Sequence, residues 1–435
     1  MKILLVYPHF KKYLETNPRI LEALDFPLYA SFKTAPSLGI PILTALTPDE
    51  HELHFADGNL EEIPYDQHFD LVAINCFTPQ AKHAYVVASE FKKRGVLTVI
   101  GGIHASNMSE ECKLYADAVC IGEAEQTWGE ILTDAKNGKL KPFYRGDNSF
   151  NLDNYVMPDR RLYREKKGYD WKPLLIQSFR GCKYNCNYCA IPEAHGKCLK
   201  KRPVEHVMKE ISMNMDLDGL FLAEDQFLLP DPEIEKYAFQ FFSELKKMNY
   251  KKEIFFNSSA LINQNTELLK LIKDSGVNST YLVMGFDPIS VKAVSHNMPE
   301  EAERNIKMIQ DAGLEIFASV GVGLEADDTS VFERHIDFLA RNNIKHVEFW
   351  ILTPFPGTPM WHKYMKKDRM LIKDFDYYNG AHTVFQPKKM SVKELDDGFI
   401  WLWKEFFTRF PLAPEEAAKY YNLTDDFKMK HNIKK

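Results

Sequence analysis

Three cysteines stand at steps of four and three in the stretch "SFRGCKYNCNYCAIPEAHGKC", which runs from Ser178 to Cys198. Three thiolates on one short loop can bind three irons of a 4Fe–4S cluster and leave the fourth iron open to another ligand. A structural zinc site normally takes a fourth protein ligand, which His195 or Cys198 could supply. The spacing of Cys182, Cys186 and Cys189 therefore predicts a metal centre and favours a cluster, with zinc as the alternative.

Composition indicates a globular protein in a reducing compartment. The 435 residues suit two or three domains, and a net charge of −6 gives no general attraction to nucleic acid or anionic membranes. The N-terminus reads as a strand and not as a signal peptide, so the seven cysteines favour metal-binding thiols in the cytoplasm over disulfides. Because no apolar run reaches about 20 residues, we expect no membrane span.

The elements that must position the cysteines begin with a separate α/β unit. Residues 1–140 alternate apolar runs with a helical pattern at 79–95, and we predict strands at 2–7, 70–76, 96–102 and 117–122. Such alternation is typical of a doubly wound, Rossmann-like parallel sheet, which binds ligands at the carboxyl ends of its strands. Those ends carry "PHF" (8–10), "DGN" (57–59), "CFTPQ" (76–80), "GGIHAS" (101–106) and "GEAE" (122–125).

A polar segment at 141–170 is the predicted linker to a second unit. From 171 to 359 the alternation returns, with strands expected at 174–180, 219–224, 254–259, 279–285, 315–321 and 346–352. Helical patterns at 203–215, 265–276 and 300–313 separate them, so we predict a partial (β/α)6 barrel with the cysteine loop after its first strand. Residues 360–435 are expected to form a small, mostly helical C-terminal domain.

The pattern CxxxCxxC after the first barrel strand, with Tyr188 before its last cysteine, resembles the radical SAM superfamily. The resemblance implies that S-adenosylmethionine (SAM) binds the open iron. It also implies SAM contacts from "FLAEDQF" (221–227), where Glu224 or Asp225 would meet the amino group, from Asn257 and Ser258, and from Asp287 in "MGFDPIS" (284–290). Taken alone, an acidic residue at a strand end could equally cap the next helix.

The sheet before the barrel, with "PSLGI" (36–40), "GGIHAS" and "GEAE" at its strand ends, resembles the cobalamin-binding subgroup of that superfamily. The resemblance implies a corrin over this edge. The residues expected to contact the cofactor are Phe77, Thr78, Gln80, Gly101, Gly102, His104 and Glu123. The Asp-x-His-x-x-Gly signature is absent, so we expect base-off cobalamin without a histidine from that motif below cobalt. Taken alone, Gly101–Gly102 could be a turn and Cys76 a buried thiol.

Members of the subgroup cleave SAM to a 5′-deoxyadenosyl radical, which removes hydrogen from an unactivated carbon, and methylcobalamin then supplies a methyl group. The resemblance therefore implies a C-methyltransferase that uses SAM both as methyl source and as radical source. The substrate could be a small molecule or a peptide, such as the glutamine methylated in methyl-coenzyme M reductase. A flavodoxin or ferredoxin would be the reductant, and no nucleic acid partner is expected.

Three other functions remain open at this point. One is cobalamin chemistry without methyl transfer, such as oxidation, cyclisation or ring rearrangement. The second is a non-catalytic cofactor carrier, and the third is a zinc-bound nucleic-acid module, which the negative net charge disfavours.

Overall fold

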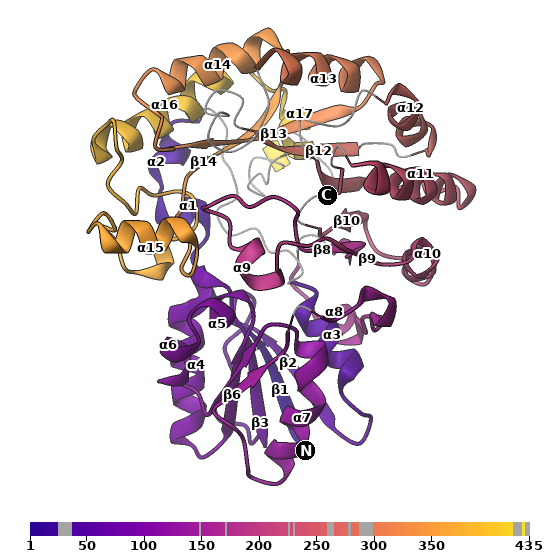
Figure 1. Ribbon diagram of the computed structural model, residues 1–435, viewed down its shortest axis with the longest axis vertical. Coiled ribbons are helices and arrows are strands. Elements are labelled where there is room, and N and C mark those ends of the chain that lie inside the picture. Colours follow the sequence, from indigo (N-terminus) through magenta and orange to yellow (C-terminus); the bar gives the residue numbers. More distant parts are fainter. Residues whose placement is uncertain are drawn as a thin grey trace.

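The computed structural model contains two parallel sheets, the first below the second in Figure 1, with helices on both. The structure describes residues 1–24, 37–147, 149–169, 172–224, 227–228, 231–258, 265–276, 280–286, 299–420 and 429–430. Within these ranges no helix is long and apolar enough to cross a membrane.

The first sheet has the strand order β2-β1-β3-β4-β5-β6, and neighbouring strands are parallel. Its strands are β1 (Lys2–Tyr7), β2 (Glu52–Asp57), β3 (Leu71–Asn75), β4 (Leu97–Gly101), β5 (Ala118–Ile121) and β6 (Phe143–Arg145). Because β2 and β3 flank β1, the strand order reverses there, and the carboxyl ends of β1 and β3 frame the crevice in which such sheets bind ligands. The doubly wound sheet is confirmed, and β6 adds a strand inside the segment expected to be a linker.

Helices cover both faces of this sheet. Side chains alternate along β1, so Leu4 and Val6 pack on one face, and Ile3 and Leu5 on the other. The first face is covered by α4 (Ala81–Lys93), α5 (Ile103–Asn107) and α6 (Ser109–Lys113), and the second by α3 (Gly39–Leu46) and α7 (Ala124–Lys136).

The second sheet has the order β14-β13-β12-β11-β10-β7, again with parallel pairs. Its strands are β7 (Leu174–Ile176), β10 (Leu220–Leu222), β11 (Ile254–Ser258), β12 (Thr280–Phe286), β13 (Glu315–Val322) and β14 (His346–Ile351). Outside them lie α10 (Val204–Ser212), α11 (Pro232–Lys247), α12 (Thr266–Asp274), α13 (Pro299–Asp311) and α14 (Val331–Arg341) (Figure 1). Over the described residues β14 and β7 do not pair, so the predicted partial barrel is confirmed as an open one.

The C-terminal region is helical, as predicted, and shares the core of the barrel. It comprises α15 (Pro359–Lys366), the 3₁₀ turn η4 (Phe375–Tyr377), α16 (Val392–Arg409) and α17 (Pro414–Tyr420). Phe399, Trp403 and Phe406 of α16 are buried in the same cluster as β13 and β14.

The N-terminal segment joins the two units in a way that the sequence did not indicate. After β1 the chain forms α1 (Tyr13–Thr16) and α2 (Arg19–Glu22), which lie beside α16 and β14 (Figure 1). The Tyr13 hydroxyl donates to the carbonyl oxygen of Phe349 at 2.5 Å, and Ile20 is buried in the barrel core. β14 is the last strand of its sheet, so one of its edges has no partner strand among the described residues. The N-terminal segment covers part of that edge.

Candidate active site

The cysteine loop leaves the barrel at the carboxyl end of β7. It is closed by an antiparallel pair, β8 (Phe179–Arg180) with β9 (Lys200–Lys201). Gly181 has a φ of +87°, and a Cβ there would lie 2.2 Å from the carbonyl oxygen of Cys198, so glycine is required where the ends of the loop meet. Cys182 is buried, Cys186 and Cys189 are half-buried, and Cys198 is exposed.

The cysteine loop supplies three thiols that can bind three irons of a 4Fe–4S cluster, each thiolate on a different iron. Zinc would require a fourth protein ligand beside them. His195, the other possible zinc ligand, places its Nδ1 3.6 Å from Glu123 Oε1. The donor set therefore fits three irons of a cluster.

Polar groups from three neighbouring strands meet next to this loop. Glu224 is buried, and its Oε1 accepts a hydrogen bond of 3.0 Å from the backbone N–H of Ser178. The side-chain amide of Asn257 donates to the carbonyl oxygen of Glu224 at 3.2 Å, and Ser258 is fully buried beside it on β11. The structure thus brings together Glu224 and Asn257, places Ser258 on the opposite face of β11 from Asn257, and adds Ser178, which the sequence analysis missed.

The remaining residues expected on the barrel side are placed differently. Tyr188 packs against the barrel core and contacts the Cys186 thiol. Asp225 and Asp287 lie outside the described residues, so their roles stay predictions. The segment after β14 approaches the cysteine loop, because the backbone N–H of Met360 donates to the carbonyl oxygen of Asn187 at 2.9 Å.

An aromatic ring stands at the carboxyl edge of the first sheet, between β1 and β3. Phe77 is half-buried, and its ring centroid lies 5.0 Å from that of Phe10. Gln80 is fully buried, and its Nε2 donates to the carbonyl oxygen of Pro8 at 2.6 Å, which ties the loop after β3 to the loop after β1. Of the three residues of this loop expected to contact the corrin, Phe77 keeps exposed surface, while Thr78 and Gln80 are buried inside the loop.

His104 lies in a buried hydrogen-bond network beneath the same loop. Its Nδ1 lies 3.2 Å from Thr78 Oγ1, and its Nε2 lies 2.8 Å from the Tyr85 hydroxyl. Burial lowers the pKa of His104 to about 4, so the ring is neutral at physiological pH. This position favours support of the loop over direct contact with a ligand.

The two glycines before His104 differ. Gly102 has a φ of +100°, and a Cβ there would lie 2.6 Å from the carbonyl oxygen of Cys76, so it permits close packing between the ends of β4 and β3. A Cβ on Gly101 would meet the Cβ of Cys120 at 3.4 Å, an ordinary contact. The structure thus requires a glycine at 102 for internal packing.

Glu123 lies in a buried ion cluster between the two sheets. Its Oε2 pairs with the guanidinium of Arg180, and its Oε1 lies 3.5 Å from Lys200 Nζ and 3.6 Å from His195 Nδ1. Burial raises the pKa of Glu123, but contact with His195 and the charges of Arg180 and Lys200 lower it to about 2. The carboxylate is therefore ionised. Lys200 and His195 lie near its Oε1, but this oxygen accepts no hydrogen bond within the described residues.

Family comparisons agree with this two-part site. A B12 binding domain model matches residues 33–132, and a Radical SAM superfamily model matches residues 176–339, which include the cysteine loop. The chain carries a B12 binding domain followed by a radical SAM domain. The first match spans β2 to β5 of the first sheet, and the second runs from the last residue of β7 into α14 of the barrel.

Several relatives of this radical SAM enzyme carry methyltransferase names. The chain is 27% identical to the bacteriochlorophyllide d C-8(2)-methyltransferase of Chlorobaculum tepidum, covering 91% of each chain, and 27% identical to the C-12(1)-methyltransferase of the same organism, covering 95% of this chain and 91% of that one. Its fold resembles that of TsrM from Kitasatospora setae, solved with cobalamin and a 4Fe–4S cluster (TM-score 0.61, 16% identity, 84% of this chain and 75% of that chain). It also resembles OxsB with aqua-cobalamin (TM-score 0.67, 12% identity, 99% of this chain and 71% of that chain).

The residues at the edge of the first sheet fit the cobalamin that the family implies. A corrin needs an apolar floor and polar partners for its peripheral carboxamides. Phe77 presents ring surface at the switch point, where such sheets bind ligands. The fit is thus one of apolar surface and position at the strand ends.

A second group of polar residues lies inside the barrel of this radical SAM enzyme, and the sequence analysis missed it. Val347 and Phe349 pack toward the helices, so Glu348 and Trp350 point into the barrel. The Ser319 hydroxyl donates to Glu348 Oε1 at 2.7 Å and accepts from Trp350 Nε1 at 3.0 Å. Half-buried Phe221, Phe255 and Phe317 line the same interior, which gives it an aromatic wall with one carboxylate.

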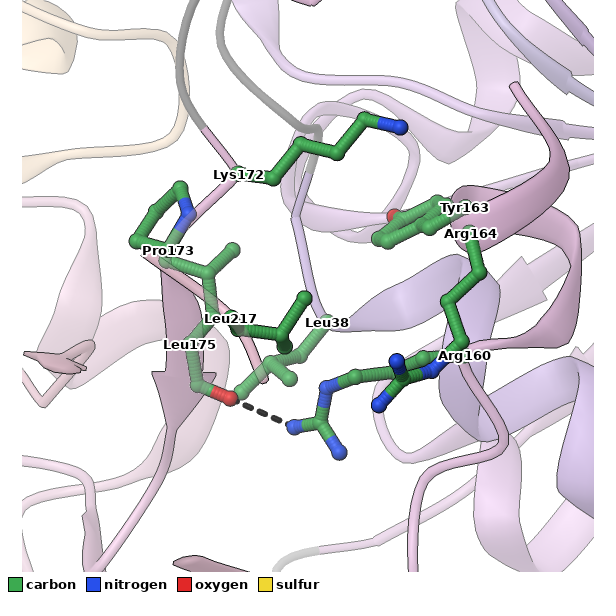
Figure 2. A pocket seen from close by; sticks show the side chains of 8 residues that line it. All are labelled: Leu38, Arg160, Tyr163, Arg164, Lys172, Pro173, Leu175 and Leu217. Carbon is green, nitrogen blue, oxygen red and sulfur yellow. Dashed lines mark hydrogen bonds between the residues drawn. The ribbon is translucent and has the colours of Figure 1, made fainter. Parts of the chain in front are cut away.

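A small hollow that is partly open to solvent (Figure 2) lies beside the amino end of β7, at the opposite end of that strand from the cysteine loop. Its walls are Leu38, Arg160, Tyr163, Arg164, Lys172, Pro173, Leu175 and Leu217. Its cations already have protein partners, since Arg160 donates to the carbonyl oxygen of Leu175 and pairs with Glu210, and Arg164 pairs with Asp216. The hollow therefore belongs to the contact between the 141–170 segment and the barrel.

Proposed function

We propose that this chain is a cobalamin-dependent radical SAM C-methyltransferase. The observation that carries the proposal is the ion cluster of Glu123 and Arg180, which joins the ligand edge of the first sheet to the loop of Cys182, Cys186 and Cys189. A methyl carrier and a radical source must face the same substrate, and this contact brings their two binding regions together.

In the proposed reaction the cofactors supply the chemistry, and the residues of the chain bind and orient them. When bound, the cluster supplies the electron that cleaves one SAM to methionine and the hydrogen-abstracting radical, and the cobalamin carries a methyl group taken from a second SAM. Each methylation thus uses two SAM, replaces one C–H by C–CH₃, consumes two electrons, and yields methionine, 5′-deoxyadenosine and S-adenosylhomocysteine.

The residues of the chain bind and orient these groups. Cys182, Cys186 and Cys189 would hold three irons, and Glu224 with Asn257 would position the polar end of SAM at the carboxyl ends of β10 and β11. Phe77 would support the corrin at the first sheet. Phe221, Phe255 and Phe317 make the barrel interior apolar, which limits access of water to reactive intermediates.

Finer features of the proposal rest on the sequence. The absence of an Asp-x-His-x-x-Gly signature supports base-off cobalamin, and all seven cysteines are thiols, which supports a reducing compartment such as the cytoplasm. A flavodoxin or ferredoxin would supply the electrons. We propose a peptide, such as the glutamine-containing segment of methyl-coenzyme M reductase, as the first substrate to test, with bacteriochlorophyllide d beside it because of the named relatives.

The test is anaerobic turnover of the reconstituted protein with methyl-deuterated SAM, cobalamin, a reductant and either substrate. A mass gain of one deuterated methyl group, with 5′-deoxyadenosine and S-adenosylhomocysteine in equal amounts, is expected for the true substrate. Formation of 5′-deoxyadenosine and an altered product that carries no methyl group would instead establish non-methylating chemistry.

A further inference from the structure

Arg180 connects the two units of the molecule immediately before the first cluster cysteine. Its Nη1 pairs with Glu123, its Nη2 donates to Glu125 Oε1 at 2.8 Å, and its Nε donates to Gln177 Oε1 at 3.0 Å. The side chains of Arg180, Glu123 and Glu125 are each at most 6% exposed. All three nitrogens of the guanidinium are therefore held, which fixes the plane of the group.

The other two side chains that face Glu123 also come from the cysteine loop. His195 ends α9, and Lys200 lies in β9, which pairs with the strand of Arg180. Both place a nitrogen within 3.6 Å of Glu123 Oε1. One carboxylate at the amino end of α7 thus faces two cations, Arg180 and Lys200, and the ring of His195, and these three side chains come from both sides of the cysteine loop.

A buried ion cluster of this kind is weak evidence for stability, because removing charges from water offsets most of their attraction. What it does provide is a defined geometry, since a guanidinium held at all three nitrogens by different side chains tolerates little displacement. Lys82 of α4 also pairs with Asp374 and Asp376 of the C-terminal region, but its side chain is 49% exposed.

We infer that Glu123 and Arg180 are positioning residues that hold the cluster loop at a fixed distance from the cobalamin-binding edge. Glu125 acts with them because it binds the second terminal nitrogen of the Arg180 guanidinium. The inference rests on the proposed function in that both cofactors are bound, but it does not depend on methyl transfer. It gives Glu123 a different role from the cofactor contact expected from the "GEAE" motif.

The test measures the separation of the two cofactors. The protein is loaded with the cluster and with cob(II)alamin, the cluster is reduced, and pulsed electron paramagnetic resonance gives the distance distribution between the two paramagnetic centres. The variants are Arg180→Lys and the double variant Glu123→Gln/Glu125→Gln, and Lys82→Met is the matched control at an exposed pair. Iron, sulfide and cobalamin contents are measured for every sample.

We expect both test variants to bind cobalamin and cluster, but with a distance distribution displaced or broadened by about 1 Å or more, a change that can lower rates by up to about 10²-fold. Lys82→Met should keep the wild-type distribution. The inference is overturned if the double variant keeps that distribution, or if it folds and loads iron but loses cobalamin, which would make Glu123 a cofactor contact. Because the double variant lies outside the cysteine loop, poor cluster loading of Arg180→Lys does not obscure the result. If the variants change the distance as expected but the wild-type protein forms no methylated product, that result would count against the proposed function and not against this inference.

Discussion

Glu348 accepts a hydrogen bond from Ser319 at 2.7 Å inside the barrel, where most other described side chains are apolar. In the strand register Ser319 pairs with both Glu348 and Gly285, two residues beyond the level of Asn257. The carboxylate therefore faces the region of the barrel in which SAM contacts are expected. The Glu348 side chain keeps exposed surface. The protein atoms around its carboxyl group nevertheless replace enough water to raise the pKa of Glu348 above its usual range.

Replacing Glu348 by Gln should raise the melting temperature at pH 8 and have less effect as the pH falls. A carboxyl with a raised pKa in the folded state opposes folding when it is ionised, and the wild type regains that stability as it is protonated. The amide keeps an acceptor for Ser319. Melting curves of Glu348→Gln and of the exposed control Glu62→Gln between pH 8 and 5 test this. A Glu348→Gln protein that is less stable than wild type by the same amount at every pH would contradict it.

Replacing Gly102 by Ala should destabilise the protein by about 3 kcal/mol or more, because the positive φ and a contact of 2.6 Å act together. Gly95→Ala is the matched control, since Gly95 also has a positive φ but no atom within 4 Å of the added Cβ, and about 1–2 kcal/mol is expected. Urea unfolding of both variants measures the difference. Equal losses would show that the contact with Cys76 relaxes easily.

Acid should unfold the protein partly through His104. Its pKa is about 4 in the folded protein and about 6.5 when unfolded, so the unfolded state takes up a proton first as the pH falls. The stability linked to this group is complete above pH 6.5 and lost between pH 6.5 and 4, by about 3 kcal/mol in total. His104→Gln should flatten the pH dependence of the unfolding free energy in that window. The exposed control His68→Gln should leave it unchanged, and a steep profile that persists in His104→Gln would contradict the prediction.

The sequence predicted the two sheets because their strands are short apolar runs separated by amphipathic helices and turn residues. It predicted the cysteine set because the ligand spacing is local. Ser319, Glu348 and Trp350 were missed for a physical reason: strands of a parallel sheet are covered on both faces, so their pattern does not say which side chains face the interior of a barrel.

Contacts between segments far apart in the chain could not be predicted from the sequence either. Nothing local marks Tyr13 as the partner of Phe349, or Arg180 as the partner of Glu123 across the two units. The motif "GEAE" predicted that Glu123 matters at a strand end, but the identity of its partner depends on how two separately folded sheets meet.

Substitution of single cysteines should show that Cys198, unlike Cys182, Cys186 and Cys189, is not needed for iron binding. Ala at position 182, 186 or 189 removes one of three iron ligands, and we expect each variant to lose most of its iron and sulfide. Cys198→Ala should keep wild-type contents, because that side chain is exposed and its backbone, not its thiol, meets Gly181 at the neck of the loop. Iron and sulfide analysis with the spectrum of the reduced cluster measures both outcomes. Loss of iron in Cys198→Ala as large as in the other three would mean that four thiols bind the metal, and no open iron would then remain for SAM.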